Sequence, residues 1–170
     1  MKITGGKFRN HSVLFKDSKT VRPTSSKMRE ALFSMIGQDL SGLSFLDAFG
    51  GSGIMGLEAF SRGAAPVCIS EQKATVAKQI TTVIKGITSE VEVKNIPAEK
   101  SMKLQVWDII FLDPPYRFAI QPILDQAFVQ ADYLVIAETS GREKVVSPKD
   151  WEIWKQKQYG TSQLTIFKKN

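Results

Sequence analysis

The sequence has little of the chemistry on which metal sites and hydrolytic triads depend. Its 170 residues include one cysteine, Cys68, and one histidine, His11. A single cysteine forms no internal disulfide, and this pair leaves no Cys-rich zinc site and little for His-based chemistry. We therefore expect no metal centre and no Ser-His-Asp hydrolysis.

Long hydrophobic runs are also absent. No apolar stretch approaches the roughly 20 residues of a membrane span, and residues 1–6 contain no hydrophobic signal region. The length suits about one domain, and a content of 42% hydrophobic and 24% charged residues is typical of a globular chain. We expect a monomeric, cytoplasmic protein with no membrane partner, in which Cys68 is a small buried hydrophobe.

Charge, in contrast, is present and unevenly distributed. The formal net charge is +6, from 23 Lys and Arg against 17 Asp and Glu. Residues 1–30 hold eight of the basic residues and two of the acidic ones, so this segment carries the whole excess. Clustered cations favour a polyanion because its phosphates release counterions on binding. The segment therefore indicates a nucleic-acid partner.

The pattern of apolar residues predicts an α/β fold. Residues 1–15 are expected to form a short basic β-hairpin, followed by a helix over 25–36 that ends at Gly37. From residue 43, short apolar runs alternate with helical stretches, which is typical of a parallel sheet covered on both faces. We expect an N-terminal extension over 1–40 and a sheet domain over 41–170.

Within the sheet domain, strands are predicted at 43–46, 66–69, 91–93, 109–112 and 133–137. Helices are predicted at about 53–62, 72–85, 98–103 and 118–130. Two further apolar runs, at 151–155 and 164–167, flank Tyr159-Gly160. They predict an antiparallel hairpin that closes one edge of the sheet.

A glycine-rich turn follows the first predicted strand, in Leu46-Asp47-Ala48-Phe49-Gly50-Gly51-Ser52-Gly53. Glycines let a ligand approach the backbone, and the helix start beyond them supplies unpaired N–H groups. Taken alone, such a turn is equally consistent with a purely structural connection between a strand and a helix.

Two carboxylates favour the ligand-binding interpretation. Asp47 ends its strand, where open α/β sheets bind ligands, and Glu71 follows the next apolar run, 18 residues after Gly53. An acid at that point can accept both hydroxyls of a ribose. A carboxylate beside the turn repels a pyrophosphate but tolerates a cation. The pattern therefore favours S-adenosylmethionine, which carries a sulfonium and an ammonium group, over NAD.

A second motif, Asp113-Pro114-Pro115-Tyr116, directly follows the apolar run 107–112. Two prolines stiffen the turn, so its carbonyl groups are held in fixed directions. The Asp113 carboxylate and the Pro114 carbonyl can both accept hydrogen bonds from one planar amino group, while Tyr116 stacks on the ring that bears it. Two acceptors of this kind would align an exocyclic amine for attack on a methyl group.

With these motifs together, the chain resembles the class I S-adenosylmethionine-dependent methyltransferases that carry an Asp/Asn-Pro-Pro-aromatic motif. It is most similar to the bacterial 16S ribosomal RNA guanine-N2 methyltransferase family. The resemblance covers nearly the whole chain, and its specific parts are Ile3-Thr-Gly-Gly-Lys-Phe-Arg9 and Arg22-Pro-Thr24 with Arg29-Glu-Ala-Leu-Phe33. It implies a Rossmann-like, mostly parallel seven-stranded sheet with an antiparallel C-terminal hairpin and an N-terminal β-hairpin extension.

The resemblance also implies three groups of site residues. The cofactor site falls on Asp47, Phe49, Gly51, Gly53 and Glu71, and the adenine on Asn95 or the Ala98 N–H, because Pro97 takes the place of the usual polar side chain. The catalytic motif is Asp113, Pro114, Pro115 and Tyr116. The RNA contacts are Arg9, Arg22, Thr24 and Arg29, and the partner is 16S rRNA or the assembled small subunit.

Two other functions fit parts of the same pattern. A DNA adenine-N6 methyltransferase shares the glycine turn and the Asp-Pro-Pro-Tyr motif, but usually needs a larger target-recognition region. A non-catalytic RNA-binding assembly factor would not need these two motifs intact.

Some conspicuous side chains receive ordinary structural interpretations. Glu58 and Arg62, four residues apart on a helix, are expected to form an exposed pair. The alternative for Arg29 is a solvated surface ion pair with Glu30 or with a carboxylate of the sheet domain. The tryptophans, Trp107, Trp151 and Trp154, are expected to pack in the core or the hairpin.

Overall fold

The computed structural model describes residues 1–15, 24–115 and 118–170. Seven strands form one sheet in the order β3-β2-β1-β4-β5-β7-β6. The strands are β1 (Phe45–Asp47), β2 (Val67–Ser70), β3 (Val91–Lys94), β4 (Trp107–Leu112), β5 (Ala131–Ser140), β6 (Trp151–Tyr159) and β7 (Ser162–Lys169). The helices are α1 (Ser26–Ile36), α2 (Ile54–Ser61), α3 (Ala74–Lys85), α4 (Ala98–Met102) and α5 (Ile120–Gln130).

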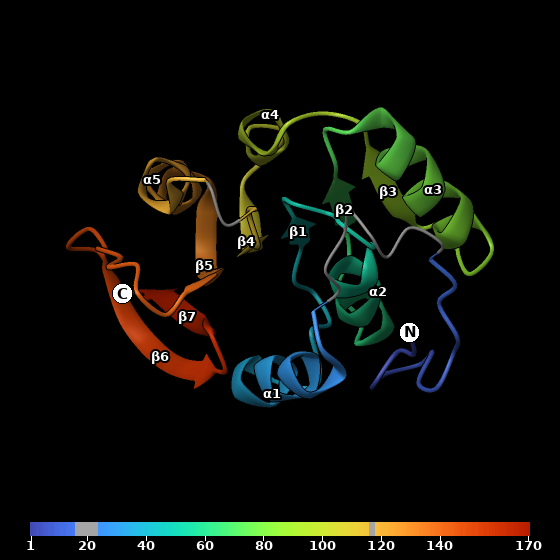
Figure 1. Ribbon diagram of the computed structural model, residues 1–170, viewed down its shortest axis with the longest axis horizontal. Coiled ribbons are helices and arrows are strands. Elements are labelled where there is room, and N and C mark those ends of the chain that lie inside the picture. The colour runs from blue at the N-terminus through green and yellow to red at the C-terminus, as the bar shows by residue number, and fades with distance from the viewer. Residues whose placement is uncertain (16–23, 116–117) are drawn as a thin grey trace.

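The helices cover the two faces of the sheet in separate groups (Figure 1). Apolar side chains of α1, α2 and α3 form one hydrophobic cluster with one face of the strands. Those of α4 and α5 form a second cluster on the other face. The alternation along a strand explains this arrangement, since Phe45 belongs to the first cluster and its neighbour Leu46 to the second. Both cores are therefore built on one sheet.

Pairing within the sheet matches the sequence pattern. The strands β3, β2, β1, β4 and β5 are all parallel, whereas β7 is antiparallel to both β5 and β6. The predicted seven-stranded α/β fold with an antiparallel C-terminal hairpin is confirmed, and each predicted strand and helix of the sheet domain overlaps an observed one.

The strand order reverses direction between β1 and β4. From β1 the chain builds β2 and β3 on one side, and then crosses to place β4 and β5 on the other. Loops leaving β1 and β4 diverge at such a point and open a crevice at the carboxyl edge of the sheet. The topology therefore places both predicted motifs at one crevice, since one follows β1 and the other follows β4.

The predicted N-terminal β-hairpin is present in a short form. Over residues 1–15, one antiparallel bridge joins Lys2 to Ser12, and the Val13 N–H donates to the Met1 carbonyl at 2.7 Å. The turn of this hairpin binds α2: the Lys7 N–H donates to the Ser61 carbonyl at 2.7 Å, and the Phe8 N–H to Ser61 Oγ at 2.9 Å.

This N-terminal segment shares the core of the sheet domain. Ile3 and Val13 are buried in the same cluster as Phe33 of α1 and Leu57 of α2. The extension over residues 1–40 therefore has no separate core, and a boundary near residue 40 stays a prediction about function.

Three simpler expectations can be compared directly with the described part of the chain. Cys68 is buried, as predicted. Trp107 and Trp151 are buried in the second cluster, and Trp154 packs against the first. No described helix is long and apolar enough to cross a membrane.

Candidate active site

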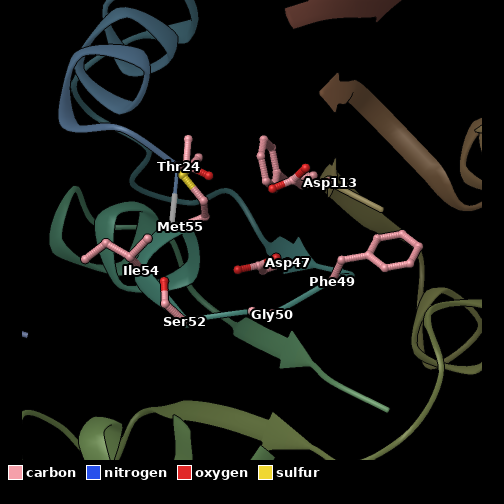
Figure 2. Close-up of a pocket in the computed structure, with 10 residues that line it drawn as sticks. Thr24, Asp47, Phe49, Gly50, Ser52, Ile54, Met55 and Asp113 are labelled. Atoms are coloured by element: carbon pink, nitrogen blue, oxygen red, sulfur yellow. The ribbon is translucent and has the colours of Figure 1, made fainter. Parts of the chain in front are cut away.

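A pocket opens at the crevice between the ends of β1 and β4 (Figure 2). It is lined by Thr24, Asp47, Phe49, Gly50, Gly51, Ser52, Ile54, Met55, Phe111 and Asp113. The glycine turn after β1 and the loop after β4 both contribute, together with the chain just before α1. Figure 2 shows Thr24 beside Met55, with Asp113 across the pocket and Asp47 between them. Residues from three separate parts of the sequence thus meet at one site.

The glycine turn is shaped by close packing against β2 and α3. Gly53 has φ of +74°, a left-handed conformation that side chains disfavour, and it is the N-cap of α2. A Cβ on Gly53 would lie 2.8 Å from the Ile80 side chain. Glycine is therefore required for the backbone to turn this tightly into the helix.

Glu71 lies against the same turn. Its carboxylate accepts hydrogen bonds from the Gly51 N–H at 3.3 Å and from the Lys73 N–H at 2.8 Å. The side chain is fixed at the end of β2 and next to the glycine turn, where the sequence analysis expected it. Gly51, Gly53 and Glu71 are therefore brought together.

Asp47 is a buried carboxylic acid at the floor of the pocket's glycine turn. It is 1% exposed, and neither carboxylate oxygen has a hydrogen-bond partner of normal geometry among the described residues. Burial raises the pKa of Asp47 to about 7, assisted by the negative charge of Glu71 and opposed by the nearby N–H groups of Gly56 and Phe49. A buried carboxylate with unused acceptors is suited to a ligand that brings positive charge or N–H donors.

Asp113 begins the loop that leaves β4, and it faces the pocket across from the glycine turn. Pro114 is half-buried and Pro115 is exposed. The loop continues to Phe118, whose N–H donates to the Pro115 carbonyl at 2.8 Å. Tyr116 lies outside the described residues, so its predicted stacking role stays a prediction.

Phe118, which the sequence motifs did not single out, contacts the pocket-lining Phe49. Its ring meets the ring of Phe49 edge-on with centroids 6.0 Å apart, and the side chain is 40% exposed. The contact joins the glycine turn to the loop after β4. An aromatic residue two positions after Tyr116 is the signal in the sequence that could have indicated it.

The two residues predicted to contact adenine, Asn95 and Ala98, differ in whether their hydrogen-bond donors are already used within the protein. Asn95 uses its amide nitrogen to donate to the backbone carbonyls of Glu71 and Gln72, at 2.8 and 3.0 Å. Both amide hydrogens are thus engaged in joining the loops after β2 and β3. Ala98 is buried at the first position of α4, where backbone N–H groups lack partners within the helix. Of the two, Ala98 offers the donor better suited to a ligand.

Arg29 corrects one prediction. Instead of facing solvent as an RNA contact, it is 2% exposed, and its Nε donates to Glu58 Oε1 at 3.0 Å. Its other nitrogens donate to the carbonyls of Thr24 at 2.6 Å and Lys2 at 2.8 Å. All three groups of the guanidinium are used inside the protein, so Arg29 positions the chain that leads into the pocket.

The predicted pair of Glu58 and Arg62 forms, but its predicted exposure is wrong. Glu58 is 0% exposed and Arg62 is 4% exposed, and the two form a buried ion pair. Glu58 also accepts from the Thr4 N–H at 2.9 Å and the Thr4 hydroxyl at 3.0 Å. The helix position was predicted correctly, but the N-terminal segment lies over this side of α2 and buries it.

The remaining predicted RNA contacts occupy different places. Thr24 lines the pocket itself. Arg9 is exposed and follows the contacts that residues 5–8 make with Ser61, at the end of α2 remote from the glycine turn. Arg22 lies outside the described residues. Of the described members of this group, Thr24 lines the pocket and Arg9 lies away from it.

A doubly covered sheet of this strand order, with acidic and glycine-rich loops at its switch point, defines a Rossmann-like class I methyltransferase fold. The chain belongs to the family described as Conserved hypothetical protein 95, whose model matches residues 1–168.

Named relatives cover nearly the whole chain. It is 28% identical over 179 residues to Ribosomal RNA small subunit methyltransferase D of Haemophilus influenzae, covering 98% of this chain and 93% of the relative. The protein of the same name from Escherichia coli K12 is 27% identical over 178 residues, covering 99% and 90%.

Solved structures agree in fold. The structure named "Putative methyltransferase yhhF from Escherichia coli" has a TM-score of 0.85 and 26% identity, and the match covers 100% of this chain and 98% of that one. Magnesium protoporphyrin IX methyltransferase from Synechocystis, solved with bound SAM, has a TM-score of 0.68 at 12% identity, covering 85% and 79%. The second likeness shows the fold alone.

Proposed function

We propose that this protein is an S-adenosylmethionine-dependent methyltransferase acting on the exocyclic N2 amine of a guanine in 16S rRNA. The names of the full-length relatives support a ribosomal RNA substrate. The observation that carries the proposal is the presence of two carboxylates on opposite sides of one pocket, where the strand order reverses between β1 and β4. Asp47 is buried with unused acceptors, and Asp113 lies opposite it in the same pocket.

The residues on the Asp47 side of the pocket fit the cofactor. Asp47 would face the cationic part of S-adenosylmethionine, Gly51 and Gly53 allow close approach, and Glu71 at the end of β2 would accept the ribose hydroxyls. Phe49, with Phe118 against it, would border the same site. When bound, the cofactor supplies an activated methyl group.

The residues on the Asp113 side of the pocket fit the exocyclic amino group of the target base. The Asp113 carboxylate and the Pro114 carbonyl would accept its two hydrogens, and Tyr116 would stack on the base. A guanine amine is a weak nucleophile, so orientation and hydrogen-bond acceptance are what these residues contribute. The target base must leave its stack to reach the pocket.

The substrate proposal is tested by methyl transfer from labelled S-adenosylmethionine to small ribosomal subunits that lack the modification. Digestion to nucleosides should place the label on N2-methylguanosine. Label on adenine in DNA would instead support the DNA adenine-N6 alternative. No transfer to any nucleic acid, despite RNA binding, would support the assembly factor.

Asp113→Ala tests the assignment of the catalytic group. We expect a loss of turnover of at least about 100-fold, with the Kd of S-adenosylhomocysteine changed less than about threefold, because Asp113 is assigned to the base. The matched control is Asp125→Ala, which removes an exposed carboxylate from α5. Equal losses of turnover and cofactor binding would refute the role given to Asp113.

A further inference from the structure

A second basic surface lies on the C-terminal hairpin, far in sequence from the basic N-terminal segment. It consists of Tyr133 of β5, Trp154, Lys155, Lys157 and Tyr159 of β6, and Lys168 of β7. We call these six residues the hairpin surface. The aromatic members pack against the first hydrophobic cluster, which is the cluster beneath α1 and α2. The surface therefore lies on the same side of the sheet as the N-terminal segment.

The lysines of this surface are held close to aromatic rings. Lys155 Nζ lies 3.9 Å from the ring centroid of Trp154, and Lys168 Nζ lies 5.3 Å from the same ring. Lys157 Nζ lies 5.6 Å from the ring of Tyr159, and Lys168 is also 6.0 Å from that of Tyr133. These distances are within the range of cation–π attraction.

The positive charges are not neutralised within the described chain. None of the three lysines forms an ion pair with a described carboxylate, although Glu152 is opposite Lys168 in the strand register. Ammonium groups without a carboxylate partner are suited to bind an external anion. Lys155 also donates to the Met35 carbonyl at 2.6 Å, which ties it to the end of α1.

The direction of β6 connects this surface to the active site. Both β5 and β6 are antiparallel to β7, so β6 runs in the same direction as β1 and β4. Tyr159 is therefore at the carboxyl edge of the sheet, where Asp47 and Asp113 lie. The part of β6 in this surface, residues 154–159, spans roughly 20 Å, enough for about three nucleotides.

We propose that the hairpin surface binds a single-stranded stretch of the RNA substrate next to the target nucleotide. Lysines supply contacts to phosphates, and the half-buried rings beside them keep an exposed part for contact with bases. Cations and aromatic rings together are the combination used by sequence-tolerant single-strand binding. A single strand fits because the target base has to be unstacked. The proposal rests on the proposed function, since it presumes an RNA substrate.

The test is the double variant Lys157→Gln/Lys168→Gln, which leaves Lys155 and its bond to α1 intact. The matched control is Lys100→Gln/Lys103→Gln, which removes two exposed charges from α4 and its C-cap on the opposite face of the sheet. Binding of a 16S rRNA transcript is measured across salt concentrations, and kcat and KM on small subunits are measured at saturating S-adenosylmethionine. Thermal unfolding checks that both double variants are folded. If the hairpin double variant unfolds at a lower temperature than the parent, Lys157→Gln alone is used in its place.

For the hairpin variant we expect the slope of log Kd against log salt to fall by about 1.4, from roughly 0.7 for each single-strand phosphate contact. KM should rise severalfold while kcat stays within twofold, and the control should match the parent. A variant equal to the control in both measurements overturns the hairpin surface but leaves the proposed function standing.

Two other results are equally decisive. A raised KM on small subunits, together with unchanged binding to the naked transcript, would mean that the surface contacts a ribosomal protein. That result would overturn the RNA proposal. A parent protein that neither binds nor methylates rRNA would overturn the proposed function, and the hairpin proposal with it.

Discussion

Asp47 is held in the folded protein at a cost to stability. The unfolded chain loses this proton near pH 3.8, whereas the folded protein holds it up to about pH 7. The carboxyl group therefore favours the folded state below about pH 4, and that contribution is lost as the pH rises between about 4 and 7. A cationic ligand that binds the ionised form would reverse the penalty.

We predict that cofactor affinity depends on the ionisation of Asp47. The Kd of S-adenosylhomocysteine, which retains the ammonium group, should fall about tenfold between pH 6 and pH 8, because a group with a pKa near 7 is about one-tenth ionised at pH 6. Calorimetric titrations in buffers of different ionisation enthalpy should detect the released proton.

Asp47→Asn is the companion experiment. The variant should lose this pH dependence and bind the cofactor weakly, yet unfold at a higher temperature than the parent at pH 8, because the buried charge is gone. A pH profile unchanged by the substitution would show that another group is responsible.

Glu58 has the opposite role, since it compensates charges that are already buried. It is surrounded by Arg29, Arg62 and Thr4. Removing one partner of a buried pair leaves the other charges uncompensated. Glu58→Gln should lower the free energy of unfolding by about 3 kcal/mol in urea titrations.

Glu30→Gln is the matched control, because Glu30 is exposed on α1 beside Arg29 in sequence. It should change the free energy of unfolding by less than about 0.5 kcal/mol. If the two variants were equally destabilised, the network around Glu58 would have no special importance.

At the scale of elements, the sequence predicted what depends on local pattern. Apolar runs and helical periodicity located the strands and helices, and strand-end logic brought Asp47 and Asp113 to one crevice. The pattern failed where partners are remote in sequence. Nothing near Arg29 indicates Glu58, which is 29 residues away and on another helix.

The docking of the N-terminal segment on α2 was missed for a related reason. Gly5-Gly6 predicted a hairpin turn, and these glycines also allow the segment to approach α2. A Cβ on Gly6 would lie 1.8 Å from the Ser61 carbonyl oxygen, and one on Gly5 would lie 2.4 Å from Arg62. A turn and a docking contact use the same residue type, so composition alone does not separate them.

This contact predicts a specific cost for Gly6→Ala. Gly6 has φ of +73° and no room for a methyl group, so we expect a loss of more than about 3 kcal/mol in unfolding free energy. Gly42→Ala isolates the conformational part, because Gly42 has φ of +81° and nothing within 4 Å of a Cβ. It should cost about 1–2 kcal/mol. Equal costs would mean that the segment does not dock closely on α2.

At the scale of the whole molecule, charge and core do not divide the chain in the same place. The basic segment over residues 1–30 contributes Ile3 and Val13 to the common core. Deleting residues 1–22 would therefore expose the core as well as remove charge, and could not measure RNA binding alone. Neutralising exposed side chains of this segment is the cleaner experiment.

We therefore predict the effect of Lys7→Gln/Arg9→Gln, since both residues are exposed and α2 holds the backbone around them. If the N-terminal segment contacts RNA, the slope of log Kd against log salt for a 16S rRNA transcript should fall by about 1.4–1.8, with cofactor affinity unchanged. Lys78→Gln/Lys85→Gln, which removes two exposed charges from α3, should leave the slope unaltered.

The N-terminal pair of substitutions is then combined with Lys157→Gln/Lys168→Gln. The reductions in slope should add if one RNA strand crosses both surfaces at separate phosphates. A slope that falls no further in the four-residue variant than in either pair would mean that the two surfaces do not contribute separate phosphate contacts.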